Sequence, residues 1–351
     1  MSDHNVVLST EPEGGKGGIA TVVPIHMEAL NLIGSTQLIP THRGGGAIGK
    51  ILPWVASFFK IIAVLFVRRK DRITFHIHPG SGFCIIRMLL LALYLRFVLV
   101  QRTVVYVHTP YLEQYLQNTT WRFLLLTLIR CGHRSVALTE FAKELIERES
   151  SVKNLEVVPN PYRIPKQPPR KKIRDEGRVT ILSLGRLVDG KGFAETVKAM
   201  KYLPPNYRLV IGGEGPLGVS LGKLIADEGL SERVDMEGWV SGDAKEELLR
   251  NSHVFCLPSQ IDSFGMSFVE AQVYELPIVA FAHPPVMEVV HQPGGVFVRS
   301  SDPQEIAHAI LRANELNYQS RPDAGRKWVD STFGVEIIAK KIGRLIEHCH
   351  S

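Results

Sequence analysis

Residues 254–270 read V-F-C-L-P-S-Q-I-D-S-F-G-M-S-F-V-E, and this is the most informative stretch of the chain. Its apolar start predicts a strand that ends at the proline, and a helix is expected from about Met266. The loop between them carries Asp262 and Gly265, and the helix carries Glu270. In an open parallel sheet such a loop lies at the carboxyl edge of the strands, where ligands bind.

The same stretch predicts binding of a ligand that bears both hydroxyl groups and phosphates. Carboxylates such as Asp262 and Glu270 accept hydrogen bonds from sugar or ribose hydroxyls. The first turn of the helix, from Gly265 through Met266 and Ser267, offers unpaired backbone N–H groups to an anion. Taken alone, the segment is equally compatible with a surface loop followed by an ordinary helix.

Strand-like and helix-like segments alternate along nearly all of the 351 residues, which indicates an α/β protein with parallel sheets. The length and the 45% hydrophobic content allow about two domains. Strands are expected in the first half at 5–9, 36–39, 73–77, 103–107, 134–138 and 155–158, and in the second half at 178–184, 207–212, 233–237, 253–257 and 277–281.

A proline-rich, basic segment divides the two halves. Residues 159–172 read P-N-P-Y-R-I-P-K-Q-P-P-R-K-K, which predicts an extended connector because proline disrupts helices. The expected domains are therefore 1–165 and 175–330, with a terminal helix within 331–351. That helix has an apolar stripe, which either domain could cover.

The cysteines and the charge distribution indicate the compartment and the partners. Cys84, Cys131, Cys256 and Cys349 are scattered, and no C-x-x-C or cleavable signal sequence is visible, which predicts reduced thiols in a cytosolic protein and argues against structural zinc. Residues 1–169 hold 19 Lys and Arg against 11 Asp and Glu, so the positive charge belongs to the first half.

Two apolar stretches lie in that basic half, at 51–70 and 83–102. Lys60 in one, and Arg87 and Arg96 in the other, are expected to interrupt the runs before they reach the roughly 20 apolar residues that a membrane span needs. They are either ordinary core helices or helices attached to one face of an anionic membrane. In the second case Trp54, Phe58 and Phe59, or Leu89, Leu90 and Leu93, would face lipid. A nucleic-acid partner is disfavoured, because exposed aromatic residues are not interleaved with the charges.

A basic turn follows the strand that opens the second half of the chain. It places Arg186 and Lys191 in the sequence G-R-L-V-D-G-K-G. Two cations at that position would stabilise the charge that develops on a nucleotide diphosphate as it leaves a sugar. The alternative is a solvated basic turn.

Three further turns carry residues of interest, each with an ordinary loop as its alternative. Gly14, Gly15, Gly17 and Gly18 follow the first strand without the G-x-G-x-x-G spacing, so a dehydrogenase-type dinucleotide site is not supported. His108 ends the strand at 103–107, where it can bond a hydroxyl or act as acid or base. Glu214, in G-G-E-G-P, can contact a base or sugar.

His76 and His78 form H-x-H, but without an acidic third ligand nearby they argue against a metal site.

Together these motifs resemble those of glycosyltransferase family 4 enzymes, which have the GT-B fold of two Rossmann-like doubly wound domains facing a central cleft. Arg186 and Lys191 resemble the family's diphosphate-binding pair, and Asp262 and Glu270 stand at the positions of its E-x7-E motif. Residues 264–271, F-G-M-S-F-V-E-A, and the strand and turn at 294–303 are also similar to family segments.

The resemblance implies transfer from a nucleotide sugar with retention at the anomeric carbon and without a required metal or other cofactor. It implies that Glu270 holds the ribose, Asp262 touches the donor sugar, Gly18 belongs to the N-terminal glycine loop and His108 lines the reaction centre. It also implies that the terminal helix crosses back to the first domain. Two departures are Asp262, where the family usually has Glu, and Glu275, where it often has Gly.

The function that fits is a cytoplasmic hexosyltransferase, peripheral on the inner face of the cytoplasmic membrane. It would move a hexose from a UDP- or GDP-sugar to a lipid-linked glycan in surface polysaccharide biosynthesis. The basic first domain would bind the acceptor and an anionic membrane, and nucleic acid is not expected as a partner. A GT-B sugar-nucleotide epimerase and a non-catalytic sugar-nucleotide-binding protein remain alternatives.

Overall fold

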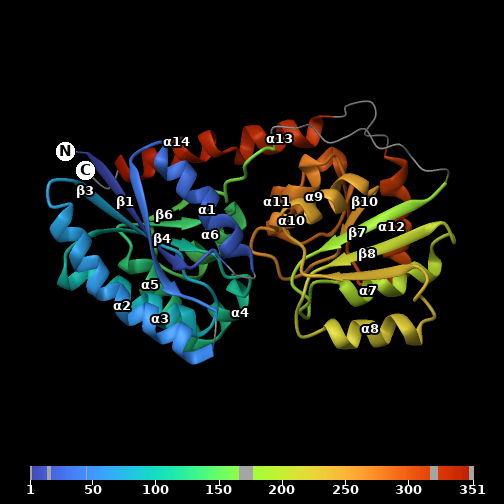
Figure 1. Cartoon of the computed structure of the whole chain (residues 1–351), viewed down its shortest axis with the longest axis horizontal. Coiled ribbons are helices and arrows are strands. Elements are labelled where there is room, and N and C mark those ends of the chain that lie inside the picture. The colour runs from blue at the N-terminus through green and yellow to red at the C-terminus, as the bar shows by residue number, and fades with distance from the viewer. Residues whose placement is uncertain (1, 14–16, 45, 166–176, 317–322, 348–351) are drawn as a thin grey trace. The chain divides into compact units, whose positions relative to one another are not determined.

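The computed structural model describes residues 2–13, 17–44, 46–165, 177–316 and 323–347, and the chain forms two compact units (Figure 1). The first unit is Met1–Arg163 together with Ser331–Ser351, and the second is Ile164–Asp330. Pro168 and Pro169 of the predicted connector lie outside the described residues.

The first unit is built on a six-stranded parallel sheet in the order β2-β1-β3-β4-β5-β6. The predicted strands are confirmed to within a few residues: β1 (Asp3–Thr10), β2 (Ser35–His42), β3 (Arg72–Ile77), β4 (Arg102–Val107), β5 (Arg134–Ala137) and β6 (Leu155–Val157). All their described pairings are parallel, so each connection crosses over the sheet through a helix or a long segment.

The helices of this unit are α1 (Gly18–Asn31), α2 (Gly46–Val67), α3 (Phe83–Leu93), the π-helical turn η1 (Tyr94–Val98), α4 (Leu112–Gln117), α5 (Thr119–Cys131), α6 (Glu140–Glu149) and α14 (Val335–Glu347). Helix α13 (Ala324–Phe333) spans the boundary with the second unit. Successive residues of each strand enter different cores. In β1, Val6 and Leu8 pack into the core under α2, α3 and α5, whereas Val7 packs into the core under α1 and α14.

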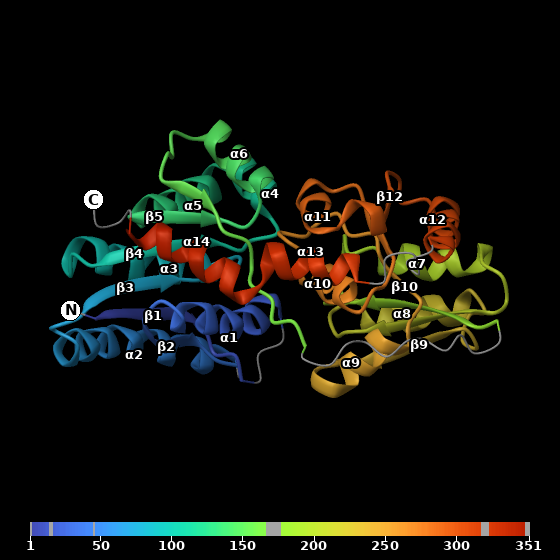
Figure 2. The same cartoon turned by 90° about the horizontal axis from the view of Figure 1, so that it is seen from above.

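Helix α14 closes one face of the first sheet. Its side chains Ile338, Ile342 and Leu345 are fully buried against β1, β4 and α1. The chain joins this unit at an isolated parallel bridge between Tyr162 and Gly334. The first unit therefore takes its core from both ends of the chain (Figure 2).

The second unit is a second six-stranded parallel sheet, in the order β12-β11-β10-β7-β8-β9. Its strands are β7 (Val179–Leu184), β8 (Tyr207–Gly212), β9 (Val234–Gly238), β10 (Val254–Leu257), β11 (Ile278–Phe281) and β12 (Gly295–Val298). Its helices are α7 (Phe193–Ala199), η2 (Met200–Tyr202), α8 (Gly218–Asp227), α9 (Gly242–Asn251), α10 (Met266–Val273), α11 (Pro284–Val289), η3 (Gln292–Gly294) and α12 (Pro303–Glu315). The predicted α/β class with two Rossmann-like parallel sheets is confirmed.

Each sheet has one point where the strand order reverses. In the second unit the chain runs from β7 outward through β8 and from β10 outward through β11, so β7 and β10 are neighbours whose following loops diverge. In the first unit the corresponding neighbours are β1 and β3. Ligands of open α/β sheets bind at such switch points, outside the carboxyl ends of the strands.

Helix α2 differs from the sequence expectation. Lys60 does not end the apolar run: Ile48–Val67 is one helical stretch of 20 residues with a mean hydropathy of 1.9, and only 17% of its most apolar window is buried. By length and composition alone it is the one described helix that could cross a membrane. Its inner side chains Ile61 and Val64 are nevertheless part of the core.

The residues expected to face lipid divide between the surface and the core. Phe59 and Leu90 are exposed, whereas Trp54, Phe58 and Leu93 are only partly buried and pack against the core. Leu89 is buried, so its predicted outward position is wrong. The sequence shows the apolar periodicity of these helices but not which stripe meets the sheet.

The three described cysteines carry free thiols. Cys131 and Cys256 are buried and Cys84 is partly buried, whereas Cys349 lies outside the described residues.

Glu275 ends helix α10 in a Schellman motif, which explains why glycine is common at this position in the family that the sequence resembles. Its backbone is left-handed, with φ 58°. The Glu275 N–H donates to the carbonyl of Gln272 at 3.0 Å, and the Leu276 N–H donates to that of Ala271 at 3.1 Å. This is the position at which helices most often carry glycine, because a Cβ is unfavourable there.

Glu275→Gly should therefore raise the free energy of unfolding by about 0.5–1 kcal/mol, because relief of the left-handed strain exceeds the entropy cost of glycine. Urea unfolding of the two proteins measures the difference. The matched control is Glu247→Gly in helix α9, an exposed helical position, where the same change should destabilise by about 1 kcal/mol. Equal losses in both variants would contradict the prediction.

Candidate functional site

The switch point of the second unit brings together two of the loops that the sequence analysis singled out. The β7–α7 loop, residues 185–192, carries Arg186 and Lys191, and the β10–α10 loop, residues 258–265, carries Asp262. The loops touch through their backbones, because the Gln260 N–H donates to the Gly190 carbonyl at 2.8 Å.

Glycines permit this close approach. Gly190 and Gly192, on either side of Lys191, have φ angles of 79° and 81°. A Cβ at Gly192 would lie 2.6 Å from the carbonyl oxygen of Pro258, which no side chain tolerates. The left-handed backbone and the close contact therefore both require glycine here.

Lys191 and Asp262 form an ion pair at this contact, with Lys191 Nζ donating to Asp262 Oδ1. Both side chains are largely buried, at 16% and 11% exposure. Burial alone would raise the pKa of the Asp262 carboxyl, but the Lys191 ammonium, the Ser259 hydroxyl and His283 together hold that pKa below its ordinary value. Asp262 is therefore a carboxylate at neutral pH.

Arg186 takes no part in this pair. Its side chain is exposed, on the same loop as Lys191. The site thus holds one cation paired with a carboxylate and, close to it in the chain, a guanidinium that faces solvent.

Glu270 is buried on helix α10 and pairs with a residue that the sequence analysis missed. Lys245 of helix α9 donates from Nζ to Glu270 Oε1 at 2.7 Å. Neither residue type nor spacing marks Lys245 in the sequence, because the contact depends on how α9 packs beside α10.

The first turn of α10 begins at Gly265, whose φ is 89° and which supplies no side-chain cap. Met266 and Ser267 follow as the first helical residues, and the Phe268 N–H donates back to the Gly265 carbonyl at 3.0 Å. The helix therefore begins where the sequence predicts it, at Met266, and binding of an anion by its first turn stays a prediction.

The G-G-E-G-P turn supports the β7–α7 loop from the side. The Leu187 N–H donates to the Glu214 carbonyl at 3.0 Å, while the Glu214 side chain is exposed. A Cβ at Gly213 would lie 1.8 Å from the Gly185 carbonyl oxygen, and one at Gly215 would lie 2.2 Å from the Leu187 carbonyl oxygen. These glycines are therefore required by packing between the two loops.

His283 is a second residue that sequence reasoning missed. It follows β11, and its Nε2 lies 3.1 Å from the backbone carbonyl of Asp262, to which it donates. The contact ties the Asp262 loop to the segment that follows β11. A histidine shortly after a strand was the available signal, as it was for His108.

The two remaining predicted site residues lie in the first unit. Gly18 opens helix α1, and a Cβ there would meet nothing within 4 Å, so packing does not require the glycine. Gly14 and Gly15 lie outside the described residues. His108 follows β4 and is 8% exposed.

His108 belongs to a buried cluster at the carboxyl edge of β3 and β4. Its Nε2 lies 2.9 Å from Nδ1 of His78, whose ring stacks on Tyr106 at 4.3 Å between centroids. His26 of α1 packs edge-on against His78, and Nδ1 of His76 lies 3.0 Å from the Tyr106 hydroxyl. No group of three or more potential ligands in the described chain is arranged to hold a metal.

Burial keeps these histidines neutral. It lowers the pKa of His76 to about 3 and that of His108 to about 4. The pKa values of His26 and His78 are also lowered, first by burial and then by neighbouring histidines. At neutral pH His108 is therefore uncharged, and it can form a hydrogen bond with a hydroxyl.

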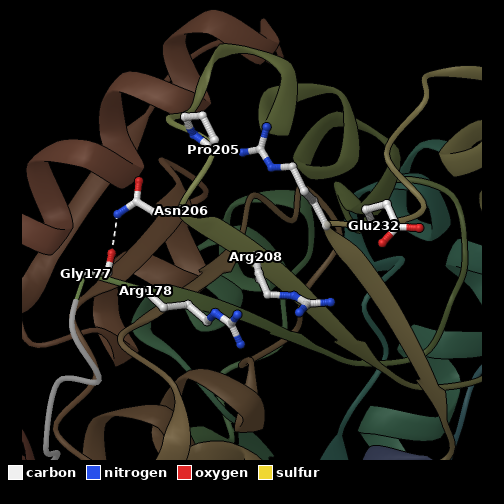
Figure 3. A pocket seen from close by; sticks show the side chains of 7 residues that line it. Gly177, Arg178, Pro205, Asn206, Arg208 and Glu232 are labelled. Atoms are coloured by element: carbon white, nitrogen blue, oxygen red, sulfur yellow. Dashed lines mark hydrogen bonds between the residues drawn. The ribbon is translucent and has the colours of Figure 1, made fainter.

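A cavity of about 390 Å³ lies at the opposite edge of the second sheet, at the amino ends of its strands (Figure 3). Arg178 and Arg208 extend into it, while Arg233 is engaged by the backbone carbonyls of Leu203, Pro204 and Tyr207. Glu232 also lines this cavity. None of the predicted site residues lines this cavity.

Comparison with known proteins finds a family to which the second unit is similar. Residues 166–327 match the family model of glycosyl transferases group 1. The chain is 30% identical over 143 residues to an uncharacterized glycosyltransferase of Methanocaldococcus jannaschii, covering 40% of this chain and 36% of that protein. It is 27% identical over 245 residues to one of Haemophilus influenzae, covering 65% and 67%.

A third relative is the amylovoran biosynthesis glycosyltransferase AmsK of Erwinia amylovora, 26% identical over 179 residues, which cover 48% of this chain and 44% of that protein. These alignments span from about a third to two thirds of the relatives' lengths.

Solved structures share the fold over the whole chain. Sucrose-phosphate synthase of Thermosynechococcus elongatus has a TM-score of 0.79 at 18% identity, covering 99% of both chains. HepE of Anabaena, solved in complex with UDP-glucose, has a TM-score of 0.76 at 15% identity, covering 98% of this chain and 99% of that one. At these identities the likeness shows the fold alone.

The histidine cluster predicts acid sensitivity of the first unit. Because the folded pKa values lie below 6.5, the unfolded chain binds more protons than the folded chain as pH falls. The contribution of the neutral histidines to the free energy of unfolding is complete above pH 6.5 and should decline progressively toward pH 4. Hydrogen exchange of β3 and β4 amides between pH 7.5 and 4.5 measures it.

The variant His108→Gln should show a shallower decline, whereas Tyr106→Phe should lower stability at every pH without changing the slope. A slope unaltered by His108→Gln would contradict the assignment.

Proposed function

Because residues 166–327 carry a glycosyl transferases group 1 domain on a GT-B fold, we propose that this chain transfers a hexose from a nucleotide sugar to a lipid-linked glycan acceptor. The anomeric configuration is retained, as in the family 4 enzymes whose motifs it resembles. The donor is a UDP- or GDP-sugar, and the product belongs to surface polysaccharide assembly. AmsK, a relative named for amylovoran biosynthesis, supports that last assignment.

The observation that carries the proposal is the pairing of Lys191 with Asp262 at the switch point of the second sheet. The ammonium and the solvent-facing guanidinium of Arg186 form a place for the donor diphosphate, which gains charge as its bond to the sugar breaks. Asp262, which is bound to the same ammonium, lies beside that place and contacts the donor sugar. Its side chain is one methylene shorter than the usual Glu, so donor identity depends on how the β10–α10 loop presents it.

The rest of the donor binds around this centre. Glu270 accepts the ribose hydroxyls, and the backbone N–H groups of Met266 and Ser267 support the diphosphate. In the first unit, Gly18 is the candidate residue of the N-terminal glycine loop and His108 is the candidate reaction residue, a neutral hydrogen-bonding group. Two protein cations supply the charge that a metal would otherwise provide, so the reaction is expected to need no metal.

The first unit offers a surface for the membrane that holds the acceptor. The outer side of α2 exposes apolar side chains at three- and four-residue steps: Ile48, Leu52, Val55, Phe59, Ile62 and Phe66. We call these residues, together with exposed Phe83 and Leu90 of α3 and Phe97 of η1, the apolar stripe. Trp54 Nε1 donates to the Arg87 carbonyl at 3.0 Å, which joins α2 to α3.

Basic residues border the apolar stripe. Lys50 and Lys60 flank it, and exposed Arg68, Arg69 and Lys70 follow at the end of α2. An apolar face with a cationic border suits the interface of an anionic bilayer. Because Ile61 and Val64 are in the core, we expect α2 to lie on a membrane rather than to cross it. The proposed location is the inner face of the cytoplasmic membrane.

Release of free nucleotide from UDP- and GDP-sugars, measured with and without a lipid-linked acceptor, tests the activity. Transfer predicts acceptor-dependent release. An epimerase would convert the donor without an acceptor, and a binding protein would do neither.

The variant Arg186→Met should weaken calorimetric affinity for the nucleotide about tenfold or more through loss of a charge-assisted bond. Arg208→Met, at the opposite edge of the same sheet, is the control. Equal affinities for the two variants would refute the diphosphate assignment.

For the membrane, Phe59→Asp combined with Phe66→Asp, and separately Lys60→Glu with Arg68→Glu and Arg69→Glu, should reduce co-sedimentation with phosphatidylglycerol-containing vesicles. Val219→Asp and Lys223→Glu, both exposed on helix α8 of the second unit, are the matched controls. Undiminished sedimentation of both sets of α2 variants would remove the docking proposal.

A further inference from the structure

We propose that Lys245 is a positioning residue for nucleotide recognition, acting by orienting the Glu270 carboxylate toward the ribose hydroxyls. The inference rests on the proposed function, because it takes Glu270 as the ribose acceptor. It adds a residue of helix α9 to a site otherwise formed by the β7–α7 and β10–α10 loops and the start of α10.

The geometry of the pair is that of a built contact rather than a surface ion pair. Nζ of Lys245 lies 2.7 Å from Glu270 Oε1, and the two side chains are 24% and 8% exposed. The α10 residues from Phe268 to Val273 are all buried. A carboxylate in such surroundings is costly unless a charged or hydrogen-bonding partner is supplied, and Lys245 supplies it.

A second contact fixes how α9 lies on α10. Arg250, on the same helix as Lys245, bonds Glu246 at 2.9 Å and lies over the ring of Tyr274 at 5.8 Å. Glu246 is thereby occupied and does not compete with Glu270 for Lys245. Tyr274 follows Glu270 by one helical turn, so the two contacts hold α9 and α10 in a defined register.

The chemistry of the pair leaves room for a diol. A carboxylate offers about four acceptor positions on two oxygens, and the ammonium takes one of them on Oε1. The lysine ammonium has no hydrogen-bond acceptor atom. It therefore cannot accept a hydrogen bond from a ribose hydroxyl in place of Glu270. Because the ammonium holds the Glu270 side chain in one orientation, little rotamer freedom remains to be lost when the ribose binds.

This role makes a specific prediction about the 2′-hydroxyl. Loss of Lys245 should lower affinity only for ligands whose hydroxyls use Glu270. It should have less effect on a 2′-deoxynucleotide, which lacks one of the hydroxyls that would bind Glu270. A lysine that contacted phosphate would affect both ligands equally.

Calorimetric titration of the full chain with UDP and GDP, each beside its 2′-deoxy analogue, tests the inference. Lys245→Met should weaken ribonucleotide binding about five- to tenfold and reduce the preference over the deoxy analogue by a similar factor. Lys245→Arg should retain most of the preference, and Glu270→Gln should lose it.

The control is Lys201→Met, which breaks another 2.7 Å lysine–glutamate pair in the same unit, with Glu228. It should leave the ribose preference unchanged. A lower melting temperature of Lys245→Met with an unaltered preference would show a purely structural pair and overturn the inference. Equal weakening of both ligands would also overturn it. If the unmodified protein binds neither nucleotide, the proposed function fails, and this inference fails with it.

Discussion

The ion pair between Lys191 and Asp262 is the contact on which the proposed donor site depends. It joins the two loops that diverge from the switch point of the second sheet, and it can form only because Gly190 and Gly192 let the backbones meet. The buried carboxylate in turn needs the ammonium. The loop geometry, the charge of Asp262 and the position of the cation are therefore set by one contact.

The same principle recurs across the second unit. Each acid of the predicted motif forms an ion pair with a lysine: Asp262 pairs with Lys191, and Glu270 pairs with Lys245. A ligand that brings hydroxyls and phosphates meets carboxylates and cations already held in place, which limits the ordering cost of binding. The first unit follows a different principle, because its edge at His108 is formed by neutral, buried rings rather than by ion pairs.

Most of the fold and part of the site could be predicted from the sequence, since both depend on local patterns. Strand and helix periodicity predicted the two sheets, the solved structures confirm the GT-B fold, and residues 166–327 match the family model of glycosyl transferases group 1. Lys245 and the contact of His78 with His108 were not predicted, because each depends on which elements become neighbours. The outward stripe of α2 was ambiguous for a related reason: both sides of that helix are apolar, and only the packed structure shows which meets the sheet.

The insertion of α14 into the core of the first unit has a consequence for how the protein is made. Ile338, Ile342 and Leu345 cover β1 and β4, yet the ribosome adds them only after the entire second unit has been synthesised. Until then one face of the first sheet, including Val7 and Tyr106, lacks the part of its cover that α14 provides and exposes apolar surface that chaperones recognise. The second unit, whose residues are contiguous, can fold co-translationally, and the first unit matures last although its synthesis begins first.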